Sequence, residues 1–194
     1  MRKTKTEAAA TRDRILATTS RVVLEKGLAT VGMRDLMQAA GLTPGGFYRH
    51  FASRDELIAE AIRTAFNRLL DMLETEKANE PRSKQLGHII AVYLGQSHLT
   101  DDGSAPFLCP LAQLGAELKH AAPVIQAEGF KGYQRLVKFV TGCIVPSTSP
   151  TDEARGKGIV STLVGAVILA NLAPDKESRH AILNEAKLSI AGHK

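Results

Sequence analysis

The segment that decides the fold is GLTPGGFYRHFASRDELIAEA, residues 41–61. Thr43 and Pro44 mark the start of a short helix, because threonine can cap a helix and the missing proline N–H costs no hydrogen bond there. Gly45 and Gly46 follow inside this helix, although an interior glycine costs about 1 kcal/mol relative to alanine. Without side chains at these positions, the backbone N–H groups can approach a phosphate or a base edge. The segment therefore indicates a surface for close contact, unless the glycines form a loose turn.

A second short helix precedes this segment and completes a recognisable motif. Apolar residues at helical spacing predict one helix over 33–40, ended by Gly41, and another over 43–51. Two short helices joined by a glycine-containing turn form a helix-turn-helix. The residues expected to be buried on its inner face are Leu36, Met37, Ala40, Leu42, Phe47 and Phe51, packed on Ile15, Val22 and Val23 of a first helix that ends at Gly27.

The remainder of the chain is predicted to be helical as well. Ser53, with Glu56 three residues later, forms a capping box for a long helix that runs to about Ala78. Further helices are expected over about 83–99, 111–121, 123–144, 151–173 and 175–191. No window alternates apolar and polar residues with a period of two, so the predicted fold class is all-α.

Positive charge is concentrated at the N-terminus. The net charge is +5, and residues 1–55 hold ten Lys and Arg against five Asp and Glu, whereas residues 56–194 hold fifteen of each. This asymmetry favours a polyanionic partner for the N-terminal quarter. A solvated basic terminus explains the charge alone equally well.

The sequence shows no pattern of an enzyme or a metal protein. The HExxH, GxSxG, GxGxxG and GxxxxGK[ST] motifs are absent, and the six histidines show no metal-ligand spacing. We therefore expect no catalytic residue, no metal and no cofactor. Two cysteines without CxxC spacing and an N-terminus without a signal-peptide core predict a cytoplasmic location. The apolar run over 158–173 is short for a membrane span and is predicted to be a buried helix.

The opening segment resembles the signature of the tetracycline-repressor (TetR) family of transcriptional regulators. The resemblance begins near Thr11 and continues to about Ala65, and the glycine pair together with CPLAQLGAEL (residues 109–118) looks like one subgroup of that family. The resemblance implies a homodimer with an N-terminal three-helix DNA-binding domain, residues 1–52. A C-terminal domain, residues 53–194, would bind a small-molecule effector and dimerise. The implied partners are double-stranded operator DNA, the effector and a second copy of the chain.

The resemblance also assigns residues to the DNA. Thr43, Pro44, Gly45 and Gly46 fall where the recognition helix meets the major groove, whereas Tyr48, His50 and Arg54 fall where phosphates are contacted. Arg49 is the candidate for reading a guanine edge, and Arg34 with the tail residues Arg2, Lys3 and Lys5 would add electrostatic attraction. Pro44 departs from the family pattern, which often has a longer polar residue there.

Three of these residues also have a purely structural interpretation. Tyr48 could pack on the first helix, His50 could bind a carbonyl at the helix end, and Arg34 could pair with a neighbouring acid.

The expected effector site lies on the middle helices and their connecting loop. Few charges occur among its candidates, which predicts an apolar or aromatic effector, although ordinary core packing is the alternative for each. The candidate lining residues are Phe66, Tyr93, Phe107, Cys109, Leu114, Phe130, Tyr133 and Phe139.

Cys109 supports an alternative function. It precedes Pro110 at a predicted helix start, where the helix dipole would lower the pKa of a thiol. A redox or electrophile sensor of the same fold is therefore one alternative, and a buried packing role for Cys109 is the simpler interpretation. An all-α interaction module without sequence-specific DNA binding is a third hypothesis.

The last two helices are expected to form the dimer interface. The helix over 151–173 is apolar almost all round after Lys157, so it must be buried by its own core and by a partner copy. The resemblance implies a four-helix bundle made from two such pairs. The predicted interface residues are Ile159, Leu163, Ala166, Val167, Ala170, Ile182 and Ala186.

Overall fold

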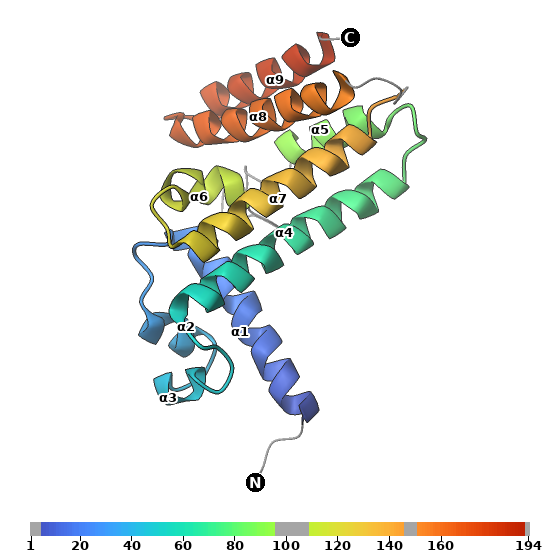
Figure 1. The fold of residues 1–194 in the computed structure, drawn as a ribbon. Helices are drawn as coiled ribbons and strands as arrows, with labels where there is room; N and C mark the ends of the chain where they lie inside the picture. Colours follow the sequence, from blue (N-terminus) through green and yellow to red (C-terminus); the bar gives the residue numbers. More distant parts are fainter. Residues whose placement is uncertain (1–4, 96–108, 146–150, 193–194) are drawn as a thin grey trace. The chain divides into compact units, whose positions relative to one another are not determined.

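The computed structural model of the chain describes residues 5–95, 109–145 and 151–192. These ranges form nine helices and no strand, which confirms the all-α prediction (Figure 1). The helices are α1 (Lys5–Lys26), α2 (Met33–Ala39), α3 (Pro44–Phe47), α4 (Arg54–Ala78), α5 (Gln85–Gly95), α6 (Pro110–Leu118), α7 (Pro123–Gly142), α8 (Thr151–Leu172) and α9 (Lys176–Gly192).

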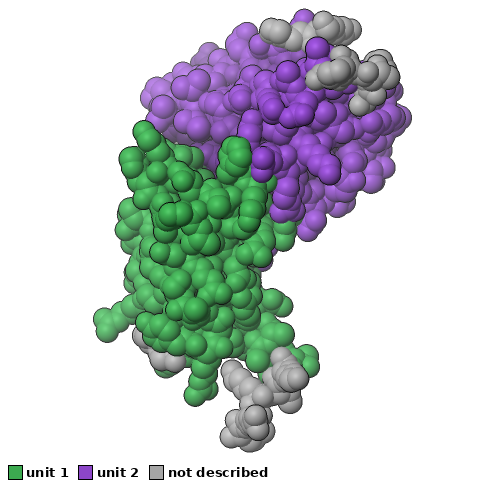
Figure 2. Space-filling model, in the orientation of Figure 1, with its two compact units in different colours: residues 1–67, 113–132 green, residues 68–112, 133–194 purple. Residues whose placement is uncertain are grey.

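The chain divides into two compact units, which Figure 2 distinguishes by colour. Unit 1 consists of residues 1–67 and 113–132, and unit 2 consists of residues 68–112 and 133–194. Three helices, α4, α6 and α7, contribute to both units. The units are defined by packing, so the sequence domains 1–52 and 53–194 stay a prediction.

The core of unit 1 contains the predicted inner face of the helix-turn-helix. All but one of the nine residues expected there are buried, and Leu42 is half-buried. Leu36 and Met37 of α2 are fully buried, as is Ile15 of α1. The three-four spacing therefore identified the inward side of each helix correctly, because that spacing places the apolar residues on one face.

The ends of the short helices follow local rules. Gly27 and Gly41 have φ angles of 86° and 69°, a left-handed conformation that glycine adopts without steric cost. The Ser53 hydroxyl accepts the N–H of Glu56 at 3.1 Å, while the Glu56 carboxylate accepts the N–H of Ala52 at 2.6 Å. The predicted cap of α4 is thus confirmed, with the return bond one residue earlier than a standard capping box.

The largest differences from the predicted helix boundaries are at the start of α1 and the end of α3. α1 begins at Lys5, well before its apolar stripe, because the alanine-rich segment TEAAATRDR favours a helix. α3 ends at Phe47 instead of continuing to Phe51. Its glycine pair gives it low helix propensity, and the chain continues in turns, with the N–H of His50 bound to the carbonyl of Phe47 at 2.9 Å.

Unit 2 is built around α8, which lies beside α9 and also contacts α5 (Figure 1). By length and composition alone α8 could cross a membrane, and it is the one such helix in the described part of the chain. One side of it packs in the core of unit 2, as predicted for a buried helix. The residues buried along that side are Gly156, Ile159, Val160, Leu163, Ala166, Val167 and Ala170.

This burial corrects the predicted dimer interface. Ile159, Leu163, Ala166, Val167 and Ala170 are all less than 7% exposed and belong to the core of the protomer itself. Ile182 and Ala186 of α9 pack against the same core. Side chains that are covered within one chain offer no surface to a second copy, so an interface on α8 would have to use its opposite side. Ile182 and Ala186 are only partly buried, so their place in an interface stays a prediction.

Candidate nucleic-acid interface

The outer surface of the helix-turn-helix is open to solvent. Arg34 of α2, Thr43 at the start of α3, and Arg49 just after α3 are exposed. Tyr48 is 78% exposed, and its ring meets the ring of Phe47 edge-on, with centroids 5.0 Å apart. The structural interpretation in which Tyr48 is buried on α1 is therefore wrong.

The start of α3 leaves the side chain of its N-cap residue without a capping hydrogen bond. Thr43 occupies the N-cap position and Pro44 the first helical position, as predicted, but the Thr43 side chain makes no capping hydrogen bond. The N–H of Gly46 already donates to the carbonyl of Thr43 at 3.0 Å, and Pro44 has no N–H to offer. The Thr43 hydroxyl is a group at this helix start that can donate a hydrogen bond to a phosphate.

Gly46 is not required by the packing of the chain. Its φ is not positive, and a Cβ added there would meet only Oγ1 of Thr43, at 3.9 Å, which is an ordinary contact. Alanine would fit this position and would favour the helix by about 1 kcal/mol. Neither the backbone conformation nor the internal packing around Gly46 therefore requires a glycine.

Arg12 of α1 connects three parts of unit 1. Its Nη2 atom lies 2.5 Å from Oε1 of Glu60, and its guanidinium stands 4.6 Å from the ring centroid of Phe51. Its Nε donates to the carbonyl of His50 at 3.4 Å. The hydrogen bond with Glu60 raises the pKa of Arg12. Sequence analysis missed this residue, because its partners are 38 and 48 positions away.

Arg54 has a structural role that the sequence did not reveal. Its Nη2 atom donates to the carbonyl oxygens of Leu28 and Val31 at 2.8 and 3.0 Å. Both acceptors lie in the connection between α1 and α2. The guanidinium that was expected to contact phosphate thus holds this connection, and any contact with DNA would have to share it.

The candidate effector residues are divided between the two units. Phe66 and Leu114 are fully buried in unit 1, where a Cβ at Gly132 would overlap the Phe66 ring. Phe130, in the same unit, is 59% exposed. Their burial or exposure is explained by packing alone, so a role in effector binding stays a proposal.

The other candidates lie in unit 2, except Phe107, which is outside the described residues. Tyr93 and Cys109 are fully buried, and their side chains are close enough to affect each other's pKa. Tyr133 is half-buried. Phe139 lies under Nζ of Lys77, which is 5.1 Å from its ring centroid. Phe139 lines an open groove of about 540 Å³ together with charged residues, which differs from the apolar pocket expected.

Burial reverses the expectation for the Cys109 thiol. The side chain is completely buried, and desolvation raises the pKa of Cys109 despite hydrogen bonds from Tyr93 and from the backbone of α6. The helix start was expected to lower this pKa. A neutral, inaccessible thiol is a poor nucleophile, so the geometry favours the packing role over an oxidant sensor.

The N-terminal segment is similar to a known protein family. Residues 15–61 match the family described as bacterial regulatory proteins, tetR family. The match covers most of α1, the helix-turn-helix and the first turns of α4.

Curated relatives are regulators that match part of the chain. The transcriptional repressor KstR2 of Mycolicibacterium smegmatis is 28% identical over 99 residues, which cover 49% of this chain and 47% of the relative. The transcriptional regulator TtgR of Pseudomonas putida is 31% identical over 87 residues, which cover 45% of this chain and 41% of the relative. The chain therefore matches about half the length of these relatives or less.

Solved structures extend the likeness of fold over nearly the whole chain. The reduced form of E. coli NemR matches with a TM-score of 0.78 and 17% identity, covering 92% of this chain and 95% of that one. SCO4454, a TetR-family transcriptional regulator from Streptomyces coelicolor, matches with a TM-score of 0.74 and 22% identity. The match covers 98% of this chain and 95% of that one. The fold is thus an N-terminal helix-turn-helix followed by a helical C-terminal domain. Together the comparisons show similarity to the tetR family over residues 15–61 and a similar fold over nearly the whole chain.

Proposed function

We propose that this chain is a cytoplasmic transcriptional repressor that binds a palindromic operator as a homodimer and releases it when a small apolar or aromatic effector binds. It has no enzymatic role in this proposal. The helix-turn-helix reads the DNA, and the C-terminal helices bind the effector and hold the two copies together.

The observation that carries the proposal is Gly46 beside an exposed polar surface. Neither backbone conformation nor internal packing requires this glycine, whereas close approach of DNA to this backbone would. Thr43, Arg49 and Arg34 are exposed around it. Arg49 is the long donor suited to the O6 and N7 atoms of guanine, and Arg34 supplies attraction to phosphate.

The outward side of α8 supports a dimer. Gly158, Thr162, Gly165, Leu169 and Leu172 follow alternating steps of four and three residues, which is the spacing of a seam between helices. Leu169 and Leu172 are 56% and 75% exposed. We call these five residues the α8 seam.

The α8 seam is self-complementary in an antiparallel pair. Small residues occupy its first half and leucines its second half, with Gly165 at the centre. Under two-fold symmetry each residue meets its mirror position in the other copy. The partner's Leu172 would then lie over Gly158, and the two Gly165 residues would allow the helices to approach closely.

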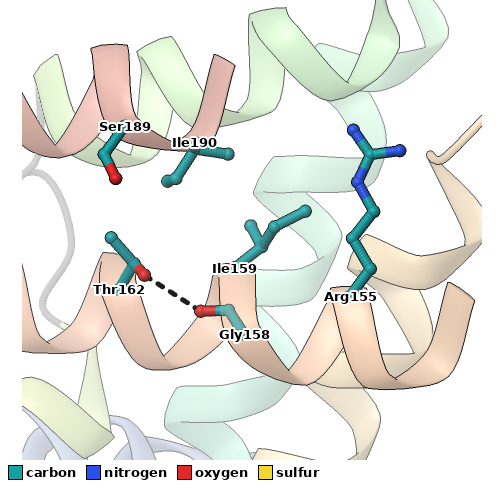
Figure 3. Close-up of a pocket in the computed structure, with 6 residues that line it drawn as sticks. All are labelled: Arg155, Gly158, Ile159, Thr162, Ser189 and Ile190. Carbon is teal, nitrogen blue, oxygen red and sulfur yellow. Dashed lines mark hydrogen bonds between the residues drawn. The ribbon is translucent and has the colours of Figure 1, made fainter. Parts of the chain in front are cut away.

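A cavity at the small end of the seam has room for such a leucine. It measures about 230 Å³ and lies between α8 and α9, with Ile159 facing Ile190, and Thr162 facing Ser189 (Figure 3). The Thr162 hydroxyl is bound to the carbonyl of Gly158 at 3.0 Å, so it needs no further partner. Leu188 adds an exposed apolar side chain on α9, at 65% exposure. These residues replace the predicted interface set in our proposal.

Selection of bound duplexes from a random DNA library, at two salt concentrations, tests the function. A palindromic enriched sequence is expected, since a symmetric dimer presents two recognition helices to half-sites about one or more turns apart. Affinity should fall as salt rises, because phosphate contacts release counterions. Binding without any sequence enrichment would contradict the proposal and favour the interaction module.

A further inference from the structure

The connection between α1 and α2, residues 27–32 (the α1–α2 loop), is held by a carboxylate from a distant helix. The Oε2 atom of Glu117, in the last turn of α6, accepts the N–H of Leu28 at 2.7 Å and the N–H of Ala29 at 3.0 Å. Glu117 is 89 residues from Leu28 along the chain. All of these residues belong to unit 1.

The same loop is also held by Arg54. The Arg54 guanidinium donates to the carbonyl of Leu28, while the Glu117 carboxylate accepts the N–H of the same residue. The backbone of Leu28 is thus bound by two side chains of opposite charge. Hydrogen bonds with one charged partner are about twice as strong as neutral ones. The loop is therefore positioned by α4 and α6 together.

Gly27 makes room for the carboxylate. A Cβ at this position would lie 2.6 Å from Oε1 of Glu117, which is closer than real Cβ contacts. The residue also ends α1 with a φ of 86°. Glycine at position 27 therefore permits both the left-handed end of α1 and the close approach of the Glu117 carboxylate.

Helix electrostatics give no reason for an acid here. Glu117 lies at the C-terminal ends of both α1 and α6, where the helix dipole favours a cation over an anion. An acid that only stabilised these helices would be placed at their N-termini. The two amides of the α1–α2 loop are thus the physical reason for a carboxylate at this position.

The α1–α2 loop determines how the chain enters the helix-turn-helix. α2 begins at Met33, directly after this loop, and the N–H of its N-cap Gly32 is bound by Oδ2 of Asp35 at 3.1 Å. α2 in turn packs against α3. A shift of the loop therefore shifts the start of α2 and, with it, the exposed surface of α3.

We infer that Glu117 is a positioning residue for DNA reading: its carboxylate fixes the α1–α2 loop in the arrangement that presents α3 to the operator. The inference rests on the proposed DNA-binding function. It also gives the PLAQLGAEL segment a role, because Leu114 and Leu118 of that segment bury α6 in unit 1 while Glu117 reaches the loop.

The test compares Glu117→Ala with Glu128→Ala in the full chain. Glu128 is a matched control, since it is an acid of unit 1 that pairs with Arg63 and Lys131 at 3.3 and 2.9 Å and does not bind the loop. Both changes remove one negative charge, and charge alone predicts equal or tighter DNA binding for both. Affinity is measured on the duplex selected by the wild type, and amide hydrogen exchange is measured at Leu28 and Ala29.

We expect Glu117→Ala to weaken binding about tenfold, within the usual range of coupling between sites, and to speed exchange at both amides. Glu128→Ala should retain wild-type affinity within about twofold. Glu117→Gln keeps the side-chain length and one acceptor oxygen, so it should recover most of the affinity for the duplex. This variant tests the inference if Glu117→Ala does not fold. Equal affinity of Glu117→Ala and wild type would overturn the inference and leave the proposed function intact. A wild type that binds no duplex would overturn both.

Discussion

The Nη2 atom of Arg12 lies 2.5 Å from Oε1 of Glu60, so the helix that precedes the helix-turn-helix is tied to the helix that follows it. Both side chains are partly buried, at 34% and 17% exposed. The pair encloses the helix-turn-helix in the sequence, and the Phe51 ring lies beneath the Arg12 guanidinium. The two short helices thus lie between two longer helices that are joined by this pair.

Loss of this pair should loosen unit 1. Glu60→Ala removes the partner of a partly buried guanidinium and should lower the free energy of unfolding by about 1 kcal/mol, a value reduced by solvent screening. Thermal unfolding followed by circular dichroism measures this change. Glu25→Ala, which breaks an exposed pair with Arg21, is the control and should have a smaller effect. Equal melting temperatures for the two variants would contradict the structural role of Arg12.

Arg54→Ala should destabilise the protein in addition to any effect on DNA. Removing the guanidinium leaves the carbonyls of Leu28 and Val31 without this partner, at a cost of about 1–3 kcal/mol. Chemical denaturation without DNA measures the loss. If stability stayed at the wild-type value while affinity for all duplexes fell alike, the phosphate contact would be the main role of Arg54.

Gly46→Ala should separate stability from recognition. Because a Cβ meets no close neighbour in the chain, the free energy of unfolding should stay equal or rise by up to about 1 kcal/mol. Affinity for the selected operator should fall, because the methyl group would occupy space needed by the DNA. Melting curves and operator titration on one preparation measure both quantities. Unchanged operator affinity would show that Gly46 has no part in close approach.

Arg49→Ala should relax sequence preference. A bidentate arginine–guanine contact contributes about 1–3 kcal/mol of discrimination, so the variant should bind operator and mismatched duplexes more equally. Arg34→Ala, which removes an exposed charge proposed to meet phosphate, should weaken all duplexes alike. Titration of each variant against a set of single-base operator variants distinguishes the two patterns. The roles are wrongly divided if both variants lose binding equally on every duplex.

Gly165→Arg should block dimerisation without damaging the protomer. No atom lies within 4 Å of a Cβ at this position, so the single chain can accept a side chain there. In the proposed dimer the two Gly165 residues meet, and a pair of arginines would separate the helices. Analytical ultracentrifugation should show a monomer. Gly87→Arg in α5 is the control, since its Cβ site is equally open, and it should remain a dimer.

The sequence alone determined where most helices begin and end and which side of the short ones faces inward. Those features depend on neighbouring residues: Gly27 and Gly41 end helices, Ser53 starts one, and three-four spacing marks one face. The same local reasoning identified the resemblance that the family match on residues 15–61 supports.

Only the tertiary structure decided which side of α8 is covered. That helix is apolar almost all round, so its sequence has no period that distinguishes the inward Leu163 from the outward Leu169. Likewise, no local pattern pairs Arg54 or Glu117 with the α1–α2 loop, because their partners are 23 to 89 positions away. Contacts across such separations arise when helices pack, and packing depends on the whole chain.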